Sequence, residues 1–162
     1  MASEQRGRNL VDFYVRTGQR RLAIRYLACL AAETDDPDRQ ARCHLAAGGL
    51  LEQEGDYADA ATAYRRVLAL EPVDRTVWYL AHNNFGYCLL QFGRYAEAEG
   101  FCRQAIQIDP ETHNAHKNLG LALAEQKEYL QGVESLIVAA RLEPRRGPSG
   151  TSISYSLPIL RC

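Results

Sequence analysis

Histidine is the first side chain to test for chemistry, because three of the four histidines recur at one place in a repeated pattern. His44, His82 and His116 each stand four residues before a glycine. A zinc ion needs its histidine nitrogens at about 2.0 to 2.1 Å, whereas packed helices lie roughly 8 to 10 Å apart. We therefore expect the three rings to pack between helices, and we predict no metal site. His113, which can share a helix face with His116, has no acid or thiol to complete one.

Cysteine does not form a reactive or metal-binding pattern either. The total is odd and no C-x-x-C pair occurs, which argues against a disulfide framework or a zinc site and indicates free thiols in a reducing compartment. No cysteine or serine stands in a recognisable nucleophile pattern. No glycine-rich loop opens a helix after a strand to hold a phosphate. The sequence therefore predicts neither an enzyme nor a cofactor. The cysteines are Cys29, Cys43, Cys88, Cys102 and Cys162.

Length and charge narrow the remaining classes of protein function. The 162 residues suit one ordinary domain, and 19 basic residues nearly balance 20 acidic ones. A nucleic-acid partner is disfavoured because the chain has no basic block. The opening MASEQRGRNL has no apolar signal-peptide core, and no run reaches the roughly 18 apolar residues of a membrane span. We expect a soluble, cytoplasmic protein without a membrane partner.

The elements that position these residues follow from an internal repeat. Three segments of 25 residues each run without a gap from a glycine to a proline, and successive glycines are 38 and then 34 residues apart. Each segment divides at a turn, QEGDY, QFGRY or EQKEY, into two amphipathic helices, and its closing proline cannot continue a helix. The unit is a helix hairpin. The segments are GGLLEQEGDYADAATAYRRVLALEP, GYCLLQFGRYAEAEGFCRQAIQIDP and GLALAEQKEYLQGVESLIVAARLEP.

Five positions shared by the segments resemble the tetratricopeptide repeat (TPR) family. They are a small residue (Gly48, Gly86, Gly120), a turn aromatic (Tyr57, Tyr95, Tyr129), a second small residue (Ala60, Ala98, Gly132), a bulky residue (Tyr64, Cys102, Leu136) and the proline (Pro72, Pro110, Pro144). The resemblance implies an all-α fold, a right-handed superhelical solenoid of antiparallel helix hairpins. It also places a bulky packing residue where the three histidines stand.

The repeat divides the chain into parts. Residues 37–144 form three TPR units, 37–73, 74–110 and 111–144. Residues 8–36 fit a degenerate hairpin with Val11 in the glycine position, which we interpret as the end cap that a stacked array requires. Residues 1–7 are predicted to be a flexible N-terminus. Residues 145–162 form an extended or disordered tail.

Two first helices are predicted to be longer than the others. Asp36 followed by Pro37 provides an N-cap and a first helical residue, and Asp74 is a second N-cap. The four additional residues between the first two glycines equal about one helical turn. Both helices should therefore overhang their neighbours at the N-terminal end.

The resemblance implies that the first helices line a concave groove. Asn84 and Asn118 occupy the same repeat position and are similar to the asparagine ladder of TPR proteins that hold extended peptides, although Ala46 interrupts it. Both amides could bind a peptide backbone or could simply be solvated. The predicted groove residues are Arg42, Leu45, Leu80, Asn83, Asn84, Tyr87, Gln91, Asn114, Lys117, Asn118 and Leu121.

These observations predict a protein-binding adaptor that takes a peptide segment or helix of unknown identity. The TPR clamp for the carboxylate of a heat-shock protein is disfavoured, because of its five positions, held here by Leu45, Gly49, Asn84, Asn114 and Asn118, only Asn84 conforms. Two alternatives stay open. One is homo-oligomeric assembly through the third repeat and the tail, and the other is a targeting subunit for an enzyme on another chain.

Two features of the surface are open to a second interpretation. Arg16, Arg20, Arg21 and Arg25 surround the first hairpin, where a solvated face is the favoured interpretation and an acidic partner the alternative. In the tail, Ile153, Tyr155 and Leu157 alternate with serines at the period of a strand. The tail is therefore expected either to be disordered or to lie extended in a groove, its own or a neighbour's.

Overall fold

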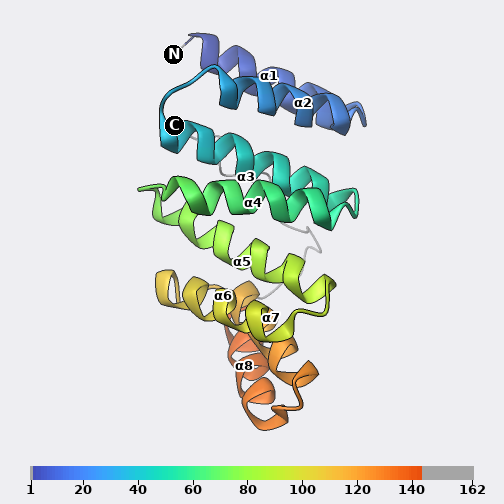
Figure 1. The fold of residues 1–162 in the computed structure, drawn as a ribbon, viewed down its shortest axis with the longest axis vertical. Coiled ribbons are helices and arrows are strands. Elements are labelled where there is room, and N and C mark those ends of the chain that lie inside the picture. Colours follow the sequence, from blue (N-terminus) through green and yellow to red (C-terminus); the bar gives the residue numbers. More distant parts are fainter. Residues whose placement is uncertain (1, 144–162) are drawn as a thin grey trace, which may run out of the picture. The chain divides into compact units, whose positions relative to one another are not determined.

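The computed structural model describes residues 2–143, with side chains described from Asn9 onward (Figure 1). The predicted tail, residues 145–162, and the closing Pro144 lie outside the described residues. The described chain forms eight helices and no strand, so the predicted all-α fold class is confirmed. The helices are α1 (Ala2–Arg16), α2 (Arg20–Ala32), α3 (Pro37–Gln53), α4 (Tyr57–Leu70), α5 (Arg75–Gln91), α6 (Tyr95–Ile108), α7 (His113–Glu125) and α8 (Tyr129–Leu142).

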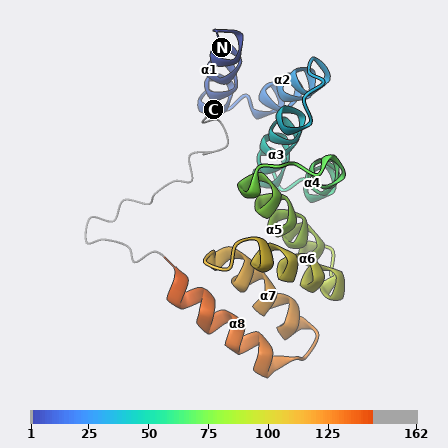
Figure 2. The same ribbon diagram turned by 90° about the vertical axis from the view of Figure 1, so that its left-hand side faces the viewer.

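The helices belong to two compact units, and the division between them falls within the sequence of α5. Unit 1 (residues 2–81) contains α1 to α4 and the start of α5, and unit 2 (residues 82–143) contains the rest of α5 with α6, α7 and α8. In each unit the helices pack as successive antiparallel neighbours (Figure 2). In unit 1, α2 packs against both α1 and α3, and in unit 2, α7 packs against both α6 and α8. The second helix of one hairpin therefore packs on the first helix of the next in both units, α2 on α3 and α6 on α7.

Both predicted N-caps are present. The Asp36 carboxylate accepts a hydrogen bond from the Asp38 backbone N–H at 3.0 Å, and Asp74 accepts one from the Thr76 N–H at 2.9 Å. Each satisfies a donor that the first helical turn leaves without a partner. Helices α3 and α5 each have 17 residues against 13 in α7, which confirms the additional turn.

The additional turns of α3 and α5 are joined to each other. The Asp38 carboxylate, in the first turn of α3, accepts a hydrogen bond from the Val73 N–H at 2.9 Å. Arg42, one turn further along α3, lies 3.9 Å from the carboxylate of Asp74, which caps α5. The start of α5 is therefore fixed against α3 by polar contacts.

The repeated glycines lie where the two helices of a hairpin come closest. A Cβ atom at Gly48 would lie 2.5 Å from Cε1 of Tyr64, and one at Gly120 would lie 2.7 Å from Cγ of Leu136. At Gly86 the nearest atom would be Sγ of Cys102, at 3.1 Å. The predicted small and bulky positions therefore face each other in all three repeats.

The hairpin turns require a left-handed backbone. Gly55 and Gly93 have φ angles of +79° and +70° in the first two repeats, a conformation that glycine adopts without a steric penalty. Lys127 occupies the corresponding turn of the third repeat with φ +68°. No helix among the described residues is long and apolar enough to cross a membrane.

Candidate peptide-binding faces

Three asparagines of unit 2 form one hydrogen-bonded chain between α5 and α7. The Asn118 Nδ2 donates to Asn83 Oδ1 at 3.1 Å, and the Asn83 Nδ2 donates to Asn84 Oδ1 at 2.9 Å. Asn83 and Asn118 are only 5% and 7% exposed, whereas Asn84 is half-buried. Because buried amides must be paired, this chain holds the two first helices in one register.

The positions of these amides differ from what the repeat pattern suggested. Asn84 and Asn118 share a repeat position, but Asn118 is buried against Asn83, which the pattern treated as an ordinary groove residue. The bonded pair is 35 residues apart, one more than the 34-residue repeat. In this pair the two first helices therefore meet at adjacent repeat positions and not at identical ones. In the sequence, the available signal for this contact was the spacing of 35 residues between the two asparagines Asn83 and Asn118.

The rest of the predicted face in unit 2 is more accessible. Tyr87 on α5 and Asn114 on α7 are half-buried, while Gln91 and Lys117 are exposed. Leu121, one turn after Lys117, has 41% of its surface exposed. Positions 84, 87 and 91 share one side of α5 by helical spacing, as do 114, 117 and 121 on α7. This surface, which we call the amide face, has a polar centre with one aromatic and one aliphatic side chain beside it.

The predicted groove residues of unit 1 are less available. Leu45 is buried, with 2% of its surface exposed. Arg42 is half-buried and directed toward Asp74, and Leu80 is half-buried. Leu45 therefore contributes to the core of unit 1, and the pairing of Arg42 with Asp74 supports the start of α5.

The histidines contact groups within the fold. His82 is buried, and its ring centroid lies 6.0 Å from that of Phe101. Burial, with a smaller contribution from Arg66, lowers the pKa of His44. His116 Nε2 lies 3.0 Å from the Pro110 carbonyl oxygen. No group of three or more metal-ligating side chains occurs among residues whose side chains are described.

The buried thiol of Cys102 is not suited to nucleophilic chemistry. Burial, reinforced by the negative charge of Glu99, raises its pKa to about 12. The thiolate is the nucleophilic form of cysteine, so Cys102 stays protonated near neutral pH and packs as a small apolar side chain. Cys29, Cys43 and Cys88 are likewise outside any disulfide bond.

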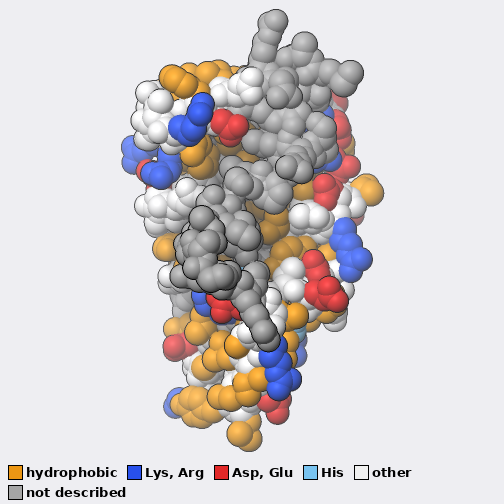
Figure 3. Space-filling view, turned by 180° about the vertical axis from the view of Figure 1, so that it is seen from behind, with side chains coloured by type: hydrophobic (Ala, Val, Ile, Leu, Met, Phe, Trp, Pro, Cys, Tyr) orange, Lys and Arg blue, Asp and Glu red, His pale blue; other side chains and the backbone are white. Residues whose placement is uncertain are grey.

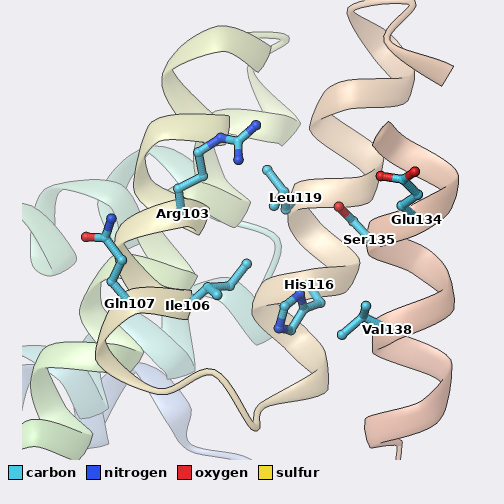
Figure 4. A pocket seen from close by; sticks show the side chains of 8 residues that line it. All are labelled: Arg103, Ile106, Gln107, His116, Leu119, Glu134, Ser135 and Val138. Carbon is cyan, nitrogen blue, oxygen red and sulfur yellow. The ribbon is translucent and has the colours of Figure 1, made fainter. Parts of the chain in front are cut away.

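A hollow lies among the helices α6, α7 and α8 of unit 2 (Figure 4). Its volume is about 390 Å³, and Ile106, Leu119 and Val138 provide an apolar lining. Arg103 stands at its edge but is already bonded to Glu99 at 2.9 Å. The hollow could accept an apolar side chain, whereas its polar residues do not converge on one point. The remaining lining residues are Gln107, His116, Glu134 and Ser135.

Comparisons with known proteins agree with this architecture. The family model described as "Tetratricopeptide repeat" matches residues 9–75 and 45–113. Among curated proteins, the E3 ubiquitin-protein ligase CHIP of Arabidopsis thaliana is 33% identical over 94 residues, 58% of this chain and 32% of its own length. The BBSome complex member BBS4 of Mus musculus is 29% identical over 103 residues, 64% of this chain and 19% of its own. The chain thus spans less than a third of the length of each of these two relatives.

Solved structures extend the similarity to the fold. MamA of Desulfovibrio magneticus RS-1 is 28% identical with a TM-score of 0.72, covering 88% of this chain and 77% of that one. The second TPR domain of Spaghetti (RPAP3), solved with the HSP90 peptide SRMEEVD, is 26% identical with a TM-score of 0.60. The match covers 66% of this chain and 90% of that one. The repeat positions, the close helix contacts and the family match agree: this chain belongs to the tetratricopeptide repeat family.

Proposed function

We propose that the chain is a protein-interaction module without chemistry of its own, and that it holds a peptide segment against the amide face of unit 2. The observation that carries this proposal is the half-buried Asn84, whose side-chain oxygen accepts a hydrogen bond from the buried Asn83. Asn118 donates a hydrogen bond to Asn83, which in turn donates to Asn84, and this arrangement fixes the position of the Asn84 side chain. A preorganised amide loses little freedom on binding, which favours affinity.

The side chains beside Asn84 define the kind of segment that fits. An amide can both donate to and accept from a peptide backbone, which suits an extended segment. Tyr87 and Leu121 provide apolar contact, and tyrosine gives a large contact area at a low entropic cost. The exposed Lys117 favours an acidic side chain in the ligand.

We expect recognition of the peptide backbone and not of a terminal carboxylate. The Spaghetti domain was solved with the HSP90 peptide SRMEEVD, and the resemblance assigns such a carboxylate clamp to five positions. In this chain Leu45 and Asn118, which hold two of those positions, are buried. Neither presents a cation to a carboxylate.

Peptide phage display on the purified chain tests the proposal. Selected peptides are then titrated by fluorescence polarisation against the wild type, Asn84→Ala, Lys117→Glu and Leu121→Asp. Losing one hydrogen bond costs about 0.5 to 1.5 kcal/mol, so Asn84→Ala should weaken binding roughly 2- to 12-fold. Lys117→Glu and Leu121→Asp change exposed side chains and should weaken binding without unfolding the chain.

Two controls make the result specific. Gln104→Ala, at an exposed position of α6, should bind every selected peptide as the wild type does. The peptide SRMEEVD should not bind above background. If the selected peptides bind all three face variants with unchanged affinity, the amide face is not the site. Preferential capture of SRMEEVD would show that a carboxylate site exists despite the substituted positions.

A further inference from the structure

The hollow of unit 2 lies at a place that an aromatic ring fills in the preceding repeat. Positions 34 residues apart are equivalent in the last two repeats, so Ser135 of α8 corresponds to Phe101 of α6. The Phe101 ring packs edge-on against Phe85 of α5, with centroids 4.7 Å apart, and lies 6.0 Å from the ring of His82. A phenylalanine of α6 therefore covers the side of α5 that carries these two rings.

The equivalent side of α7 forms a wall of the hollow. His116 and Leu119 of α7 stand 34 residues after the two rings of α5, and both line the hollow. Ser135, in place of the phenylalanine, has a small side chain whose hydroxyl donates to the Gln131 carbonyl oxygen of its own helix at 3.0 Å. The hollow is therefore the space that an aromatic side chain at position 135 would fill.

The hollow is large enough for such a ring. Its volume is about 390 Å³, and an apolar cavity of about 150 Å³ already binds benzene. Figure 4 shows Ile106 of α6 and Val138 of α8 directed into the space between their helices, with His116 of α7 between them. Because a carbonyl oxygen only accepts, the His116 Nε2–H donates to the Pro110 oxygen at 3.0 Å, which holds the imidazole in place. An inserted ring would contact side chains from all three helices.

The charges around the hollow favour a cation beside the inserted ring. Arg103 forms an ion pair with Glu99 at 2.9 Å, so its charge is compensated within α6. Glu134 of α8 is exposed and, in the part of the chain that the structure describes, forms no hydrogen bond or ion pair. The equivalent residue in the preceding repeat is Gly100, beside Phe101. The hollow thus has a carboxylate where the filled site has none, which suits a ligand with an aromatic and a basic side chain close together.

The surface next to the hollow indicates a protein partner. Leu130 and Ile137 of α8 are 83% and 47% exposed, and their helical spacing places both beside Glu134. Figure 3 shows hydrophobic side chains gathered at the end of unit 2 where α8 lies. A contiguous exposed patch of this kind marks an interaction surface. A small aromatic molecule in the hollow would leave this patch uncovered, whereas a protein segment can extend over it.

We propose that the hollow binds a segment of a partner protein. The segment inserts an aromatic side chain where Phe101 lies in the preceding repeat, places an adjacent Lys or Arg against Glu134, and extends over the exposed aliphatic side chains of α8. Leu119, which lines the hollow, and Leu121 of the amide face are two residues apart and therefore lie on opposite sides of α7. This second site thus stands independently of peptide binding to the amide face.

Methyl NMR spectra of the full chain test the site with three short peptides. The probes are acetyl-GFKG-amide and its variants GAKG and GFEG. GFKG should shift the methyl signals of Ile106, Leu119 and Val138 and leave those of Leu121 unchanged. Because its ring becomes buried, GFKG should bind at least about 10-fold more tightly than GAKG. GFEG should bind more weakly than GFKG, since its carboxylate would face Glu134.

Two variants test the positions of the ring and the cation. Ser135→Phe supplies the ring from the chain itself, so GFKG should no longer bind. Glu134→Gln should weaken GFKG binding about 2- to 5-fold, the usual effect of losing one exposed ion pair. Gln104→Ala, at an exposed position of α6 that does not line the hollow, should bind GFKG as the wild type does. Circular dichroism melting curves verify that each variant is folded.

The same spectra give the results that would overturn the proposal. It is wrong if GFKG leaves the hollow signals of the wild type unchanged, if GAKG binds equally well, or if Ser135→Phe binds GFKG with unchanged affinity. If GFKG binds only after Tyr155→Ala, the chain's own segment after α8 is the occupant and no separate partner is needed. Shifts of the hollow signals with protein concentration alone would assign the site to a second copy of this chain.

Discussion

Paired helices approach closely at the repeated glycines, and the side chain opposite each glycine determines how much space remains. Tyr64 leaves the least room, since its ring is buried and its hydroxyl donates to Glu52 at 2.9 Å. Leu136 lies near a Gly120 Cβ position that is also only 2.9 Å from the Gly132 carbonyl oxygen. Cys102, with a smaller side chain, leaves more space beside Gly86.

Alanine substitutions should therefore rank by these distances. Gly48→Ala and Gly120→Ala should each lower the free energy of unfolding by about 1 to 3 kcal/mol, the usual cost of overpacking. Gly86→Ala should cost less, because Sγ of Cys102 would lie 3.1 Å away. Urea unfolding monitored by circular dichroism measures the free energy of unfolding of each variant and so gives this ranking.

Gly100 provides the matched control for this series. It is an exposed helical glycine of α6, and an added Cβ would meet nothing within 4 Å. Gly100→Ala should stabilise the chain by about 0.5 to 1 kcal/mol through the better helix propensity of alanine. Equal losses at all four glycines would refute the close-contact explanation.

Glu52 provides a pH-dependent contribution to stability. Burial raises the pKa of its carboxyl above the ordinary value of 4.5, and the hydrogen bond from Tyr64 only partly opposes this effect. The folded state therefore binds this proton more tightly than the unfolded state. The stabilisation is fully present below pH 4.5 and is lost as the pH rises through the raised pKa. Relative to Glu52→Gln, the wild type should gain stability as the pH falls from 7 toward 4.5.

The contribution of Glu99 to stability should change with pH in the opposite direction, so Glu99 serves as the comparison for Glu52. The hydrogen bond from Gln126, followed by contributions from Arg103, lowers the pKa of Glu99. Its stabilisation is present above pH 4.5 and is lost as the pH falls through the lowered pKa. Relative to Glu99→Gln, the wild type should lose stability as the pH falls below 4.5 through the lowered pKa. Urea midpoints measured across pH for all three proteins check both signs, and parallel curves would exclude both effects.

Between helices, the Asn118–Asn83 pair is the contact that specifies how α5 and α7 align. Asn118→Ala leaves the Asn83 oxygen buried without its donor, which should cost about 1 to 3 kcal/mol. Asn83→Ala should cost a similar amount. The double variant should cost less than the sum of the two, with a coupling energy of roughly 0.5 to 3 kcal/mol. A coupling energy of zero in urea unfolding would show that the pair is not a unit.

The helices themselves were largely predictable, because the residues that begin and end a helix act locally in the sequence. Asp36, Pro37 and Asp74 act within one turn of the helices that they begin, and Gly93 ends α5 at a turn that needs positive φ. Burial was harder to predict because it depends on the neighbouring helix. Leu45 was expected in a groove but lies in the core, and Asn118 was expected beside a ligand but bonds to Asn83.

For the molecule as a whole, the repeat predicted the family and the fold class. It relates equivalent positions but carries no information on how exposed each of them is, so the exposed Phe13 and Ile137 were not foreseen. Identical repeat positions differ in exposure among the described helices: Phe13 of α1 is 48% exposed, whereas Leu50 of α3 is buried. The end helices are thus where the structure adds most to the sequence.

The polar contacts between α3 and α5 have a consequence for how repeat length can change. The additional turn of α3 supplies Asp38 to the Val73 N–H, and Arg42 faces Asp74 at the start of the longer α5. Deleting the first turn of either helix would remove one of these contacts from the other. Lengths of successive units are thereby coupled, and an insertion or deletion in one is expected to be inherited together with a matching change in its neighbour.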